Sequence, residues 1–533
     1  MPTVKDIQQY IQPLTKTDWC DIFCFAVLIG GIIYSPFLFT MGLIFMVLRI
    51  LFIGSVKEKI NKLKQSYSIL LCLLSIYILN IVGMLWTENL SGGLFELNHK
   101  LPFLILPFFA LVISPMKQRS INIIFALYTS AVTVGIFIGF IHYLIDPYAD
   151  SRVLVPTARN ISFAFHICFS LSVMVITAYR NKHLRKYLVP LCVLFVGYLF
   201  VASLISGIIS LLILFLSAVI IILRRKNKTY SLIVIILLVL VVISGAYWIY
   251  KQWDNYFTPK EEFAFSEKEK TALGNDYIHF NNKAIENGYY VNKYCCPKEI
   301  DSSWLQRTGT KTTDYCEGKY GIDNYRYKSV IYRYLTSKGL RKDASGIAEL
   351  TEKDIQNIKK GYSNVVYTER FSLKPRLYQT FYEFERYMRT SEVEDMSIIQ
   401  RYFWSKNAIN IIKQHLIIGC GTGDTRDCLV APVIDEYPEL CTTGCNPHNQ
   451  FIYIMAAFGL LGLAVMLFYI LYLPIRLQLF KNKYFVAFFI IALCWMFAES
   501  SFESFEGMTF ISALMSMFAY FKRFSMDLAT VKN

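Results

Sequence analysis

The stretch QFIYIMAAFGLLGLAVMLFYILY, residues 450–472, decides the class of fold. It holds no charged residue and exceeds the ~20 residues that a helix needs to cross the apolar layer of a membrane. Other apolar runs occupy 21–35, 36–54, 67–86, 101–115, 120–145, 161–179, 187–204, 207–223, 231–250, 484–500 and 507–521. We therefore expect an all-α polytopic membrane protein with about twelve transmembrane helices.

The composition agrees with a chain that is solvated by lipid. Hydrophobic residues make up 55% of it and charged residues 17%, against about 25% charged residues in soluble proteins. The net charge of +15 could suggest nucleic acid as a partner. The lysines and arginines instead fall in short clusters between apolar runs, as in membrane proteins, so we expect membrane lipid and no nucleic acid.

The basic residues are divided unequally between the two sides of the membrane. Twenty lie on one side, whereas the short loops of the other side hold only Lys100, Arg152 and Arg159. Because positive residues stay inside, this predicts an inner-membrane protein with both termini cytoplasmic. The first twenty residues are polar and no small-residue cleavage site ends the first apolar run, so we expect a retained first helix rather than a signal peptide.

One long polar segment, residues 251–447, separates the ninth and tenth apolar runs on the outer side. Its 197 residues are too many for a bare loop, so we expect a large, mainly helical periplasmic domain. Thr351-Glu352-Lys353-Asp354 has the form of a capping-box helix start, and Gly361 is a plausible stop. The predicted organisation is a membrane domain at 1–250, the periplasmic domain at 251–447, and a second membrane part with a cytoplasmic tail at 448–533.

Seven of the 13 cysteines fall in this outer segment. An oxidising compartment favours disulfides. A metal site that uses several of these cysteines and nearby His448 is the weaker alternative, because the spacing fits no zinc pattern, and we expect no metal. Some of the thiols could also remain free. The seven are Cys295, Cys296, Cys316, Cys420, Cys428, Cys441 and Cys445.

The candidate catalytic residue lies where the outer segment returns to the membrane, in NPHNQF, residues 446–451. The unperturbed pKa of a histidine, about 6.5, is near working pH, so a neutral His448 could take a proton from a hydroxyl. The plainer interpretation is an interfacial histidine at a helix start. Downstream, Gly459 and Gly462 indicate close packing between helices.

A second candidate, Arg401, begins an amphipathic helix. A guanidinium can bind phosphate oxygens through two parallel hydrogen bonds, although an arginine at a helix start is usually just solvated. The helix runs into a glycine-rich stretch with Gly419, Gly421 and Gly423. No strand–loop–helix unit surrounds it, so we interpret it as a tight turn and not as a nucleotide-binding loop.

Two further pairs of charged residues lie on the outer side. Arg152 and Arg159 are either tolerated loop residues or contacts to an anionic substrate. Glu499 and Glu503 are four residues apart, which on a helix means one face. They are either plain interfacial carboxylates, or they orient a sugar hydroxyl or pair with an arginine.

The pattern His448-Asn449, nine residues, then Gly459-x-x-Gly462 resembles the H-[NSQ]-x9-GxxG pattern of O-antigen ligases. The order of Arg401, amphipathic helix, glycine-rich turn and His448 is also similar to that superfamily of ligases and polymerases. So is the layout of about twelve helices with one large outer segment before the tenth. Residues 333–343 resemble a branch described as O-antigen ligase-like membrane proteins.

The resemblance implies a metal-independent, inverting glycosyltransferase of GT-C-type architecture that needs no cofactor. Its donor would be a glycan on a polyprenyl pyrophosphate, and its acceptor a hydroxyl on a glycolipid such as lipid A-core. His448 would activate the hydroxyl and Arg401 would bind the pyrophosphate. Asn449, Glu499 and Glu503 would contact substrate.

One departure concerns an arginine that many members carry where the eighth span begins. Residues 203–210 here are SLISGIIS, without arginine, so Arg159 or Arg152 would take over the pyrophosphate, or the donor is handled differently.

Other functions stay open at this stage. Within the same chemistry they are polymerisation of repeat units and transfer to protein hydroxyls. From other classes they are a lipid-glycan flippase or exporter, and a sensor or scaffold that only binds glycan. The spans hold few charged residues, which counts against a proton-coupled transporter.

Overall fold

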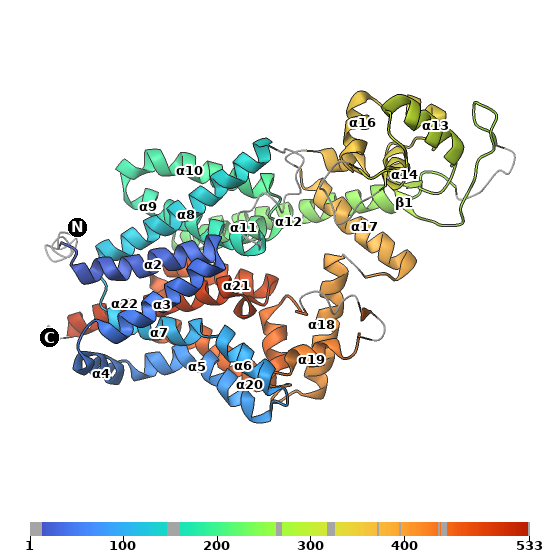
Figure 1. Ribbon diagram of the computed structural model, residues 1–533. Coiled ribbons are helices and arrows are strands. Elements are labelled where there is room, and N and C mark those ends of the chain that lie inside the picture. The colour runs from blue at the N-terminus through green and yellow to red at the C-terminus, as the bar shows by residue number, and fades with distance from the viewer. Residues whose placement is uncertain are drawn as a thin grey trace.

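The protein is described from a computed structural model that covers residues 13–145, 160–226, 228–262, 269–316, 326–369, 372–393, 396–434, 437–438 and 445–530. An elongated helical bundle carries a polar outer part at one end (Figure 1). The start of α2 and the end of α22 lie together at the opposite end of the bundle. The bundle helices are α2 (Lys16–Tyr34), α3 (Pro36–Phe52), α4 (Val56–Gln65), α5 (Tyr67–Gly83), α6 (Leu90–His99), α7 (Pro102–Ile113), α8 (Gln118–Ile145), α9 (Asn160–Arg180), α10 (Lys182–Val201), α11 (Ile205–Lys226), α12 (Lys228–Phe257), α20 (Gln450–Arg476), α21 (Lys483–Ala498) and α22 (Phe505–Thr530).

The bundle has the hydropathy of an integral membrane protein. Among the described residues, eight helices are long and apolar enough to cross a membrane, or nine if α3 and α4, bent by 105°, count as one span. Shorter apolar helices cover Ile205–Ile221, Lys483–Ala498 and Phe505–Phe521. An all-α polytopic fold is thus confirmed, while the count of about twelve and the GT-C-type architecture stay predictions.

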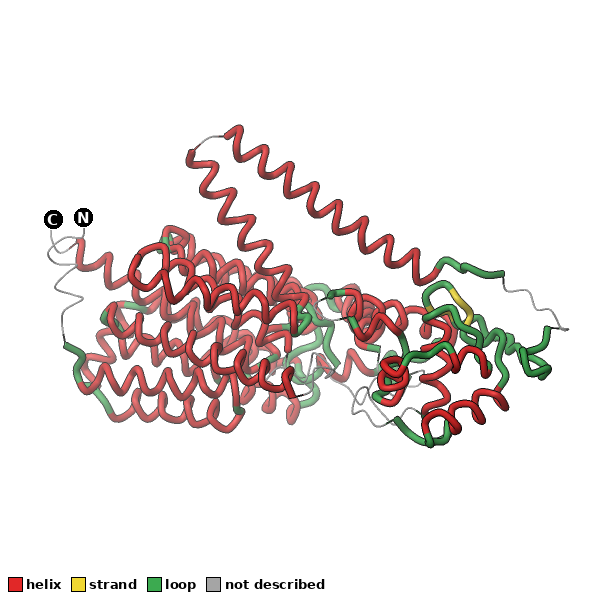
Figure 2. The backbone as a smooth tube through the Cα atoms, turned by 90° about the horizontal axis from the view of Figure 1, so that it is seen from above, coloured by secondary structure: helices red, strands yellow, loops and turns green. Residues whose placement is uncertain are grey.

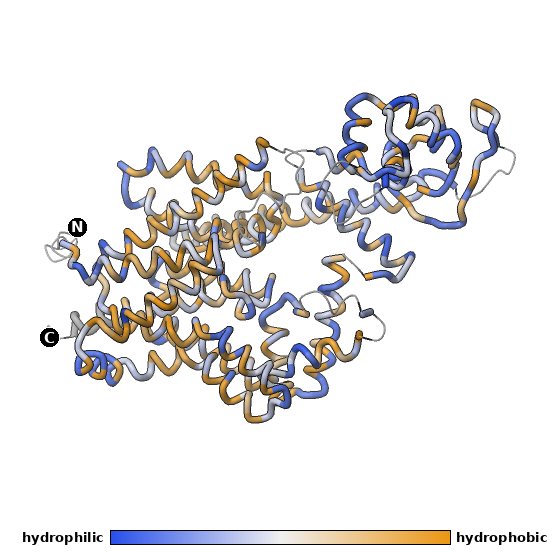
Figure 3. The backbone as a smooth tube through the Cα atoms, viewed as in Figure 1, coloured by the Kyte–Doolittle hydropathy of each residue, from blue (hydrophilic) through white to orange (hydrophobic). Residues whose placement is uncertain are grey.

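Hydrophobic residues are spread along most of the bundle backbone (Figure 3). Val134, Phe137 and Leu71 are exposed there, as expected for a surface that faces lipid. Seen from above, α12 stands away from the other bundle helices (Figure 2), whereas α11 also contacts α9 and α21. Two of the buried charges in the bundle are paired: Arg49 of α3 donates to Asp21 of α2 over 2.6 Å.

The outer part is mainly helical, as predicted. A two-stranded hairpin precedes the helices, and a core around Trp304, Ile331 and Ile358 packs them together. Its elements are β1 (Ile285–Glu286), β2 (Tyr289–Tyr290), α13 (Pro297–Thr308), α14 (Tyr327–Ser337), α15 (Ala344–Ala348), α16 (Glu352–Lys359), η3 (Val365–Thr368), α17 (Lys374–Thr390), α18 (Ser397–Gln414) and α19 (Thr425–Val430). The predicted domain limits stay predictions.

The predicted local signals of this part are confirmed. Thr351 caps α16, with the full capping box formed by Asp354. Gly361 follows the helix with φ of +89°, a backbone conformation that suits glycine.

The predicted disulfides are wrong for Cys295, Cys296, Cys420 and Cys428, which are thiols in the structure. Cys295 is fully buried and donates weakly to the carbonyls of Val291 and Lys293. Buried cysteine thus fills the role of a small apolar residue here. Cys441 lies outside the described residues.

Candidate active site

The backbone at the start of α20 sets the position of His448. Asn449 caps the helix, and its side-chain oxygen accepts from the N–H groups of Phe451 and Ile452. His448 itself has φ of +52°, which is uncommon for a residue other than glycine and is found at functional sites. Its N–H donates to Asn446 Oδ1 over 2.9 Å. The helix start therefore carries its cap and its histidine in fixed, separate positions.

Glu499 joins the two residues that the sequence singled out. One carboxylate oxygen lies 2.6 Å from His448 Nδ1, and the other lies 2.5 Å from Arg401 Nη2. Arg401 Nη1 makes a longer contact, 3.4 Å, to the carbonyl of Ala498. The site thus combines the first turns of α18, the start of α20 and the residue that ends α21.

The charge of this cluster favours an ionised Glu499. Burial raises the pKa of this carboxyl. The hydrogen bond and charge of His448 and the charge of Arg401 lower it by more, so the pKa of Glu499 lies below its usual value. A carboxylate only accepts, so His448 Nδ1 carries the proton and donates it to Glu499. In the neutral form of the ring, the lone pair is then on Nε2.

The partners of Glu499 remain accessible. The side chains of His448 and Arg401 keep 28% and 35% of their exposure, while Glu499 keeps 19%. An oriented imidazole with a free lone pair beside a guanidinium can remove a proton next to an anion. A histidine that only marks a helix start would need neither the carboxylate nor the guanidinium beside it.

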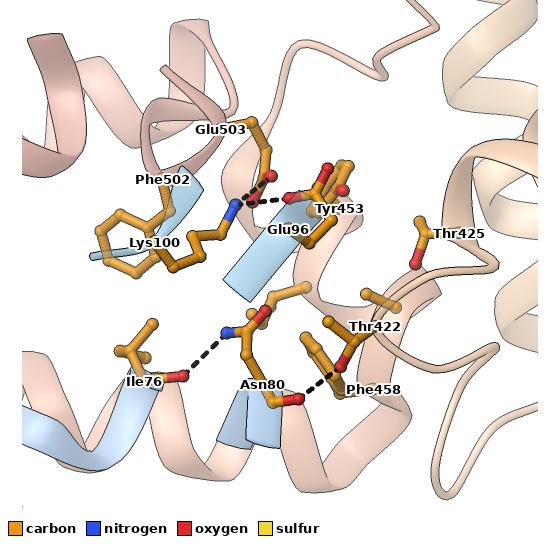
Figure 4. Close-up of a pocket in the computed structure, with 12 residues that line it drawn as sticks. Ile76, Asn80, Glu96, Lys100, Thr422, Thr425, Tyr453, Phe458, Phe502 and Glu503 are labelled. Atoms are coloured by element: carbon orange, nitrogen blue, oxygen red, sulfur yellow. Dashed lines mark hydrogen bonds and ion pairs between the residues drawn. The ribbon is translucent and has the colours of Figure 1, made fainter. Parts of the chain in front are cut away.

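A second charged cluster lies deeper and is closed (Figure 4). Lys100 is 3.2 Å from Glu96 and also forms an ion pair with Glu503. Tyr453 of α20 lines the same cluster. The adjoining cavity holds about 10 Å³, room for about one water molecule.

The structure corrects the expectation that Glu499 and Glu503 share a helix face. Helix α21 ends at Ala498, and Ser501–Glu503 form a separate 3-10 turn. The two carboxylates consequently point into different clusters: Glu499 toward His448 and Arg401, and Glu503 toward Lys100.

The glycine-rich turn after α18 lies in a break of α20. Gly459 has φ of +59° and interrupts that helix. The N–H groups of Cys420 and Gly421 donate to the carbonyls of Ala456 and Ala457. On the other side of the break, Leu460 and Leu461 donate to the carbonyls of Leu416 and Ile417, again through the backbone.

Close approach explains the glycines on both sides of this contact. A Cβ on Gly419 would lie 2.3 Å from Ala457 C, and one on Gly459 would lie 2.4 Å from Ile417 C. A Cβ on Gly423 would lie 2.2 Å from Asn89 O. The tight-turn interpretation fits Gly419 and Gly421, whose φ values are +64° and +104°, while Gly423 is required by its close approach to Asn89.

The helix-packing interpretation is wrong for Gly459, because that glycine breaks its own helix to admit a loop. A Cβ on Gly462 would meet Phe458 Cβ at 2.6 Å across this break, so this glycine leaves room for the bend within α20 itself.

The same turn also ties the outer part to the bundle, which the sequence analysis missed. The Asp424 carboxylate accepts from the N–H groups of Glu88 and Asn89 at 2.8 and 2.7 Å. Thr422 Oγ1 donates to the carbonyl of Asn80 over 2.6 Å (Figure 4). The only sequence signal was that Asp424 directly follows the glycines.

Two functional candidates cannot be placed. Arg152 and Arg159 lie outside the described residues. Asn446, by contrast, was within the quoted motif but was not singled out; its side-chain oxygen accepts from the N–H of His448 and from Ser500 Oγ.

Residues 364–467 match the family model described as O-antigen ligase. The match spans α17, α18, the glycine-rich turn, His448 and the broken part of α20, and it confirms the resemblance to the O-antigen ligase-like superfamily. A comparison with curated proteins found no match. The chain is therefore an integral membrane protein whose residues 364–467 are similar to O-antigen ligases.

Proposed function

We propose that this member of the O-antigen ligase-like superfamily transfers a glycan from a polyprenyl pyrophosphate to an acceptor hydroxyl at the outer face of the bacterial inner membrane. The observation that carries the proposal is the Glu499 carboxylate, which holds His448 and Arg401 on its two oxygens.

His448 is the general base in this reaction. The acceptor hydroxyl gives its proton to Nε2 as its oxygen attacks the anomeric carbon of the donor sugar. Glu499 acts as a positioning residue: it fixes the tautomer and orientation of the ring and stabilises the imidazolium that forms. A positioned base of this kind typically contributes about 10²–10⁴-fold to the rate.

Arg401 stabilises the leaving group. As the new bond forms, the bond between the anomeric carbon and the pyrophosphate oxygen breaks, and the electron pair leaves on the pyrophosphate. The longer contact from Arg401 Nη1 to Ala498 is the weakest that this guanidinium makes to a named partner, so Nη1 is the group that turns to a phosphate oxygen. Attack from the side opposite the leaving group inverts the anomeric centre, and no metal takes part.

The remaining predicted contacts complete the proposal. Arg152 or Arg159 supplies further positive charge to the pyrophosphate, and Asn449 supports the acceptor side, whereas Glu503 is closed off with Lys100 and has a structural role. The apolar exterior of the bundle accommodates the polyprenyl tail, and residues 251–447 form a periplasmic domain over the glycan. We assign lipid A-core as the acceptor because the histidine and glycine pattern is that of the ligases.

The test uses purified full-length protein in lipid bilayers with lipid-linked glycan and lipid A-core. Replacing His448 by alanine should lower transfer about 10²–10⁴-fold and leave the thermal unfolding midpoint unchanged. His415→Ala, an exposed histidine at the end of α18, is the matched control and should transfer normally.

Full turnover by the His448→Ala protein would refute the proposed mechanism. Transfer of one repeat unit onto another lipid-linked glycan, with none onto lipid A-core, would instead identify a polymerase.

A further inference from the structure

A cavity of about 650 Å³ lies in the outer part, away from the cluster of His448, Glu499 and Arg401. It is formed where the β1–β2 hairpin, α14 and α17 meet (Figure 1). Its volume is in the usual range for ligand sites, about 300–1,000 Å³. Neither the proposed reaction nor the fold alone accounts for it.

Paired charged side chains form one part of the lining of this cavity. Arg333 donates through Nε and Nη2 to the two carboxylate oxygens of Glu286, over 3.1 and 2.7 Å. Its guanidinium also stacks on the ring of Tyr382 at 3.8 Å. Arg389 is paired with Glu385 at 2.9 Å. Both carboxylates that line the cavity are therefore already neutralised.

Two further cations on the wall are left in excess. Arg326 and Lys328 stand at the start of α14 and line the same cavity. The carboxylate paired with Lys328 is that of Asp301, 3.8 Å away with both side chains nearly half exposed, a weak interaction in water. Arg326 faces the ring of Tyr315 at 5.8 Å. The described lining thus has four basic and two acidic side chains, which favours an anionic ligand.

The lining also has groups that suit a sugar. Tyr332 is 8% exposed. Its hydroxyl is buried and, among the described residues, has no hydrogen-bond partner. A buried hydroxyl without a partner is costly unless a ligand supplies one. Phe280, 46% exposed at the same cavity, offers an apolar ring face to the C–H side of a pyranose, and Asn282 and Asn292 add amide groups.

We propose that this cavity binds an acidic segment of an oligosaccharide, such as one with uronic acid units. The inference rests on the proposed function, because the glycan is then a substrate. Arg326 and Lys328 would bind its carboxylates, Tyr332 would bind a hydroxyl, and Phe280 would pack on a ring. Helix α17, which forms one wall, packs against α18, so a glycan held here extends toward Arg401.

The experiment measures binding of lipid-free probes to the full-length protein in lipid bilayers. The probes are hexamannuronate, neutral maltohexaose and a hexaglutamate peptide. The main variant is Arg326→Gln with Lys328→Gln. Its control removes the same charge from two exposed lysines that do not line the cavity, Lys311→Gln with Lys353→Gln.

We expect hexamannuronate to bind more tightly than either other probe. The cavity variant should weaken its binding about tenfold or more, because charge-assisted hydrogen bonds are lost, while the control stays within about twofold of wild type. Tyr332→Phe, which removes only the partnerless hydroxyl, should weaken binding of hexamannuronate about fivefold without changing the unfolding midpoint.

Unchanged hexamannuronate binding in the cavity variant would overturn the proposal. So would equal or tighter binding of hexaglutamate, which would identify an acidic peptide as the ligand. Failure of glycan transfer with intact hexamannuronate binding would remove the proposed function alone. Intact transfer without hexamannuronate binding would remove the cavity's role alone.

Discussion

Glu499 and Glu503 are four residues apart, yet they occupy two different kinds of charged cluster. Glu499 pairs with His448 and Arg401, whose side chains are each about a third exposed. Glu503 pairs with Lys100, whose side chain is 4% exposed, beside a cavity the size of a single water molecule. The two carboxylates are chemically alike, so the exposure of their partners is what distinguishes the candidate active site from the buried structural ion pair. Each prediction below tests that distinction.

The largest effect is expected at Glu499. In Glu499→Gln the imidazole loses the charge that orients it and stabilises its protonated form. Transfer should fall about 10²–10⁴-fold, as for loss of a positioned base, with a small change in thermal stability. Steady-state transfer and a thermal scan on the same preparation measure both. A strong loss of folded protein with normal turnover per folded molecule would make Glu499 a structural residue like Glu503.

Lys100→Met should act on stability and not on chemistry. It leaves the nearly buried Glu503 and the partly exposed Glu96 without their cation. Loss of one partner of a buried ion pair typically costs about 3–5 kcal/mol. We expect a lower unfolding midpoint and normal donor use by the protein that folds. Lys182→Met, at the exposed start of α10, is the control. A raised donor KM at unchanged stability would instead place Lys100 in donor binding.

Gly459→Ala tests the backbone contact that links the outer part to α20. The new Cβ meets the backbone of residue 417, and the positive φ disfavours alanine, so we expect a loss of about 1–3 kcal/mol or more. Transfer should fall as well, since the start of α20 carries His448. Gly245→Ala in α12, where no atom lies within 4 Å of the added Cβ, should be neutral or slightly stabilising. Equal stability and equal transfer in the two variants would contradict a structural role for this backbone contact.

The smallest effect is expected at Asp354, a structural carboxylate of the outer part. Burial raises its pKa, but hydrogen bonds from Lys338, Tyr334 and Thr351 outweigh burial and hold it at about 2. A folded-state pKa below the unfolded value of about 3.9 means that its stabilisation is complete above that value and is lost as pH falls toward 2. Asp354→Asn should therefore cost about 1–2 kcal/mol at pH 7, and little near pH 2.

The measurement for Asp354 is the thermal midpoint of wild type and variant between pH 7 and pH 3. Glu352→Gln, on the same helix with its carboxylate 82% exposed, is the control and should change little. A difference between wild type and Asp354→Asn that grows on acidification would refute this assignment.

The sequence predicted what depends on local pattern. Apolar length gave the membrane helices, the cap of α16 followed from its residues, and the glycines near 419 required a tight turn. Arg401 and His448 were singled out from the motif and from what these side chains can do. Their connection through Glu499 was not predicted, because it depends on where α21 ends and on two chain segments about fifty and a hundred residues away.

The errors have a physical origin too. Spacing alone suggested that Glu499 and Glu503 share a helix face, but the helix stops before either. The glycines at 459 and 462 have the spacing of a packed membrane helix, and no local pattern shows that a loop from the outer part is inserted there. The cavity around Tyr332 joins three segments that only the folded chain brings together.

The interruption of α20 at Gly459 has a mechanical consequence. The N–H groups of Leu460 and Leu461, just after the break, donate to the carbonyls of Leu416 and Ile417 and fasten the segment that follows α18 to this helix. The nine residues that begin α20 cannot tilt independently of the amphipathic helix that carries Arg401. Movement of the start of α20 therefore carries the imidazole and the guanidinium together, and their spacing is preserved.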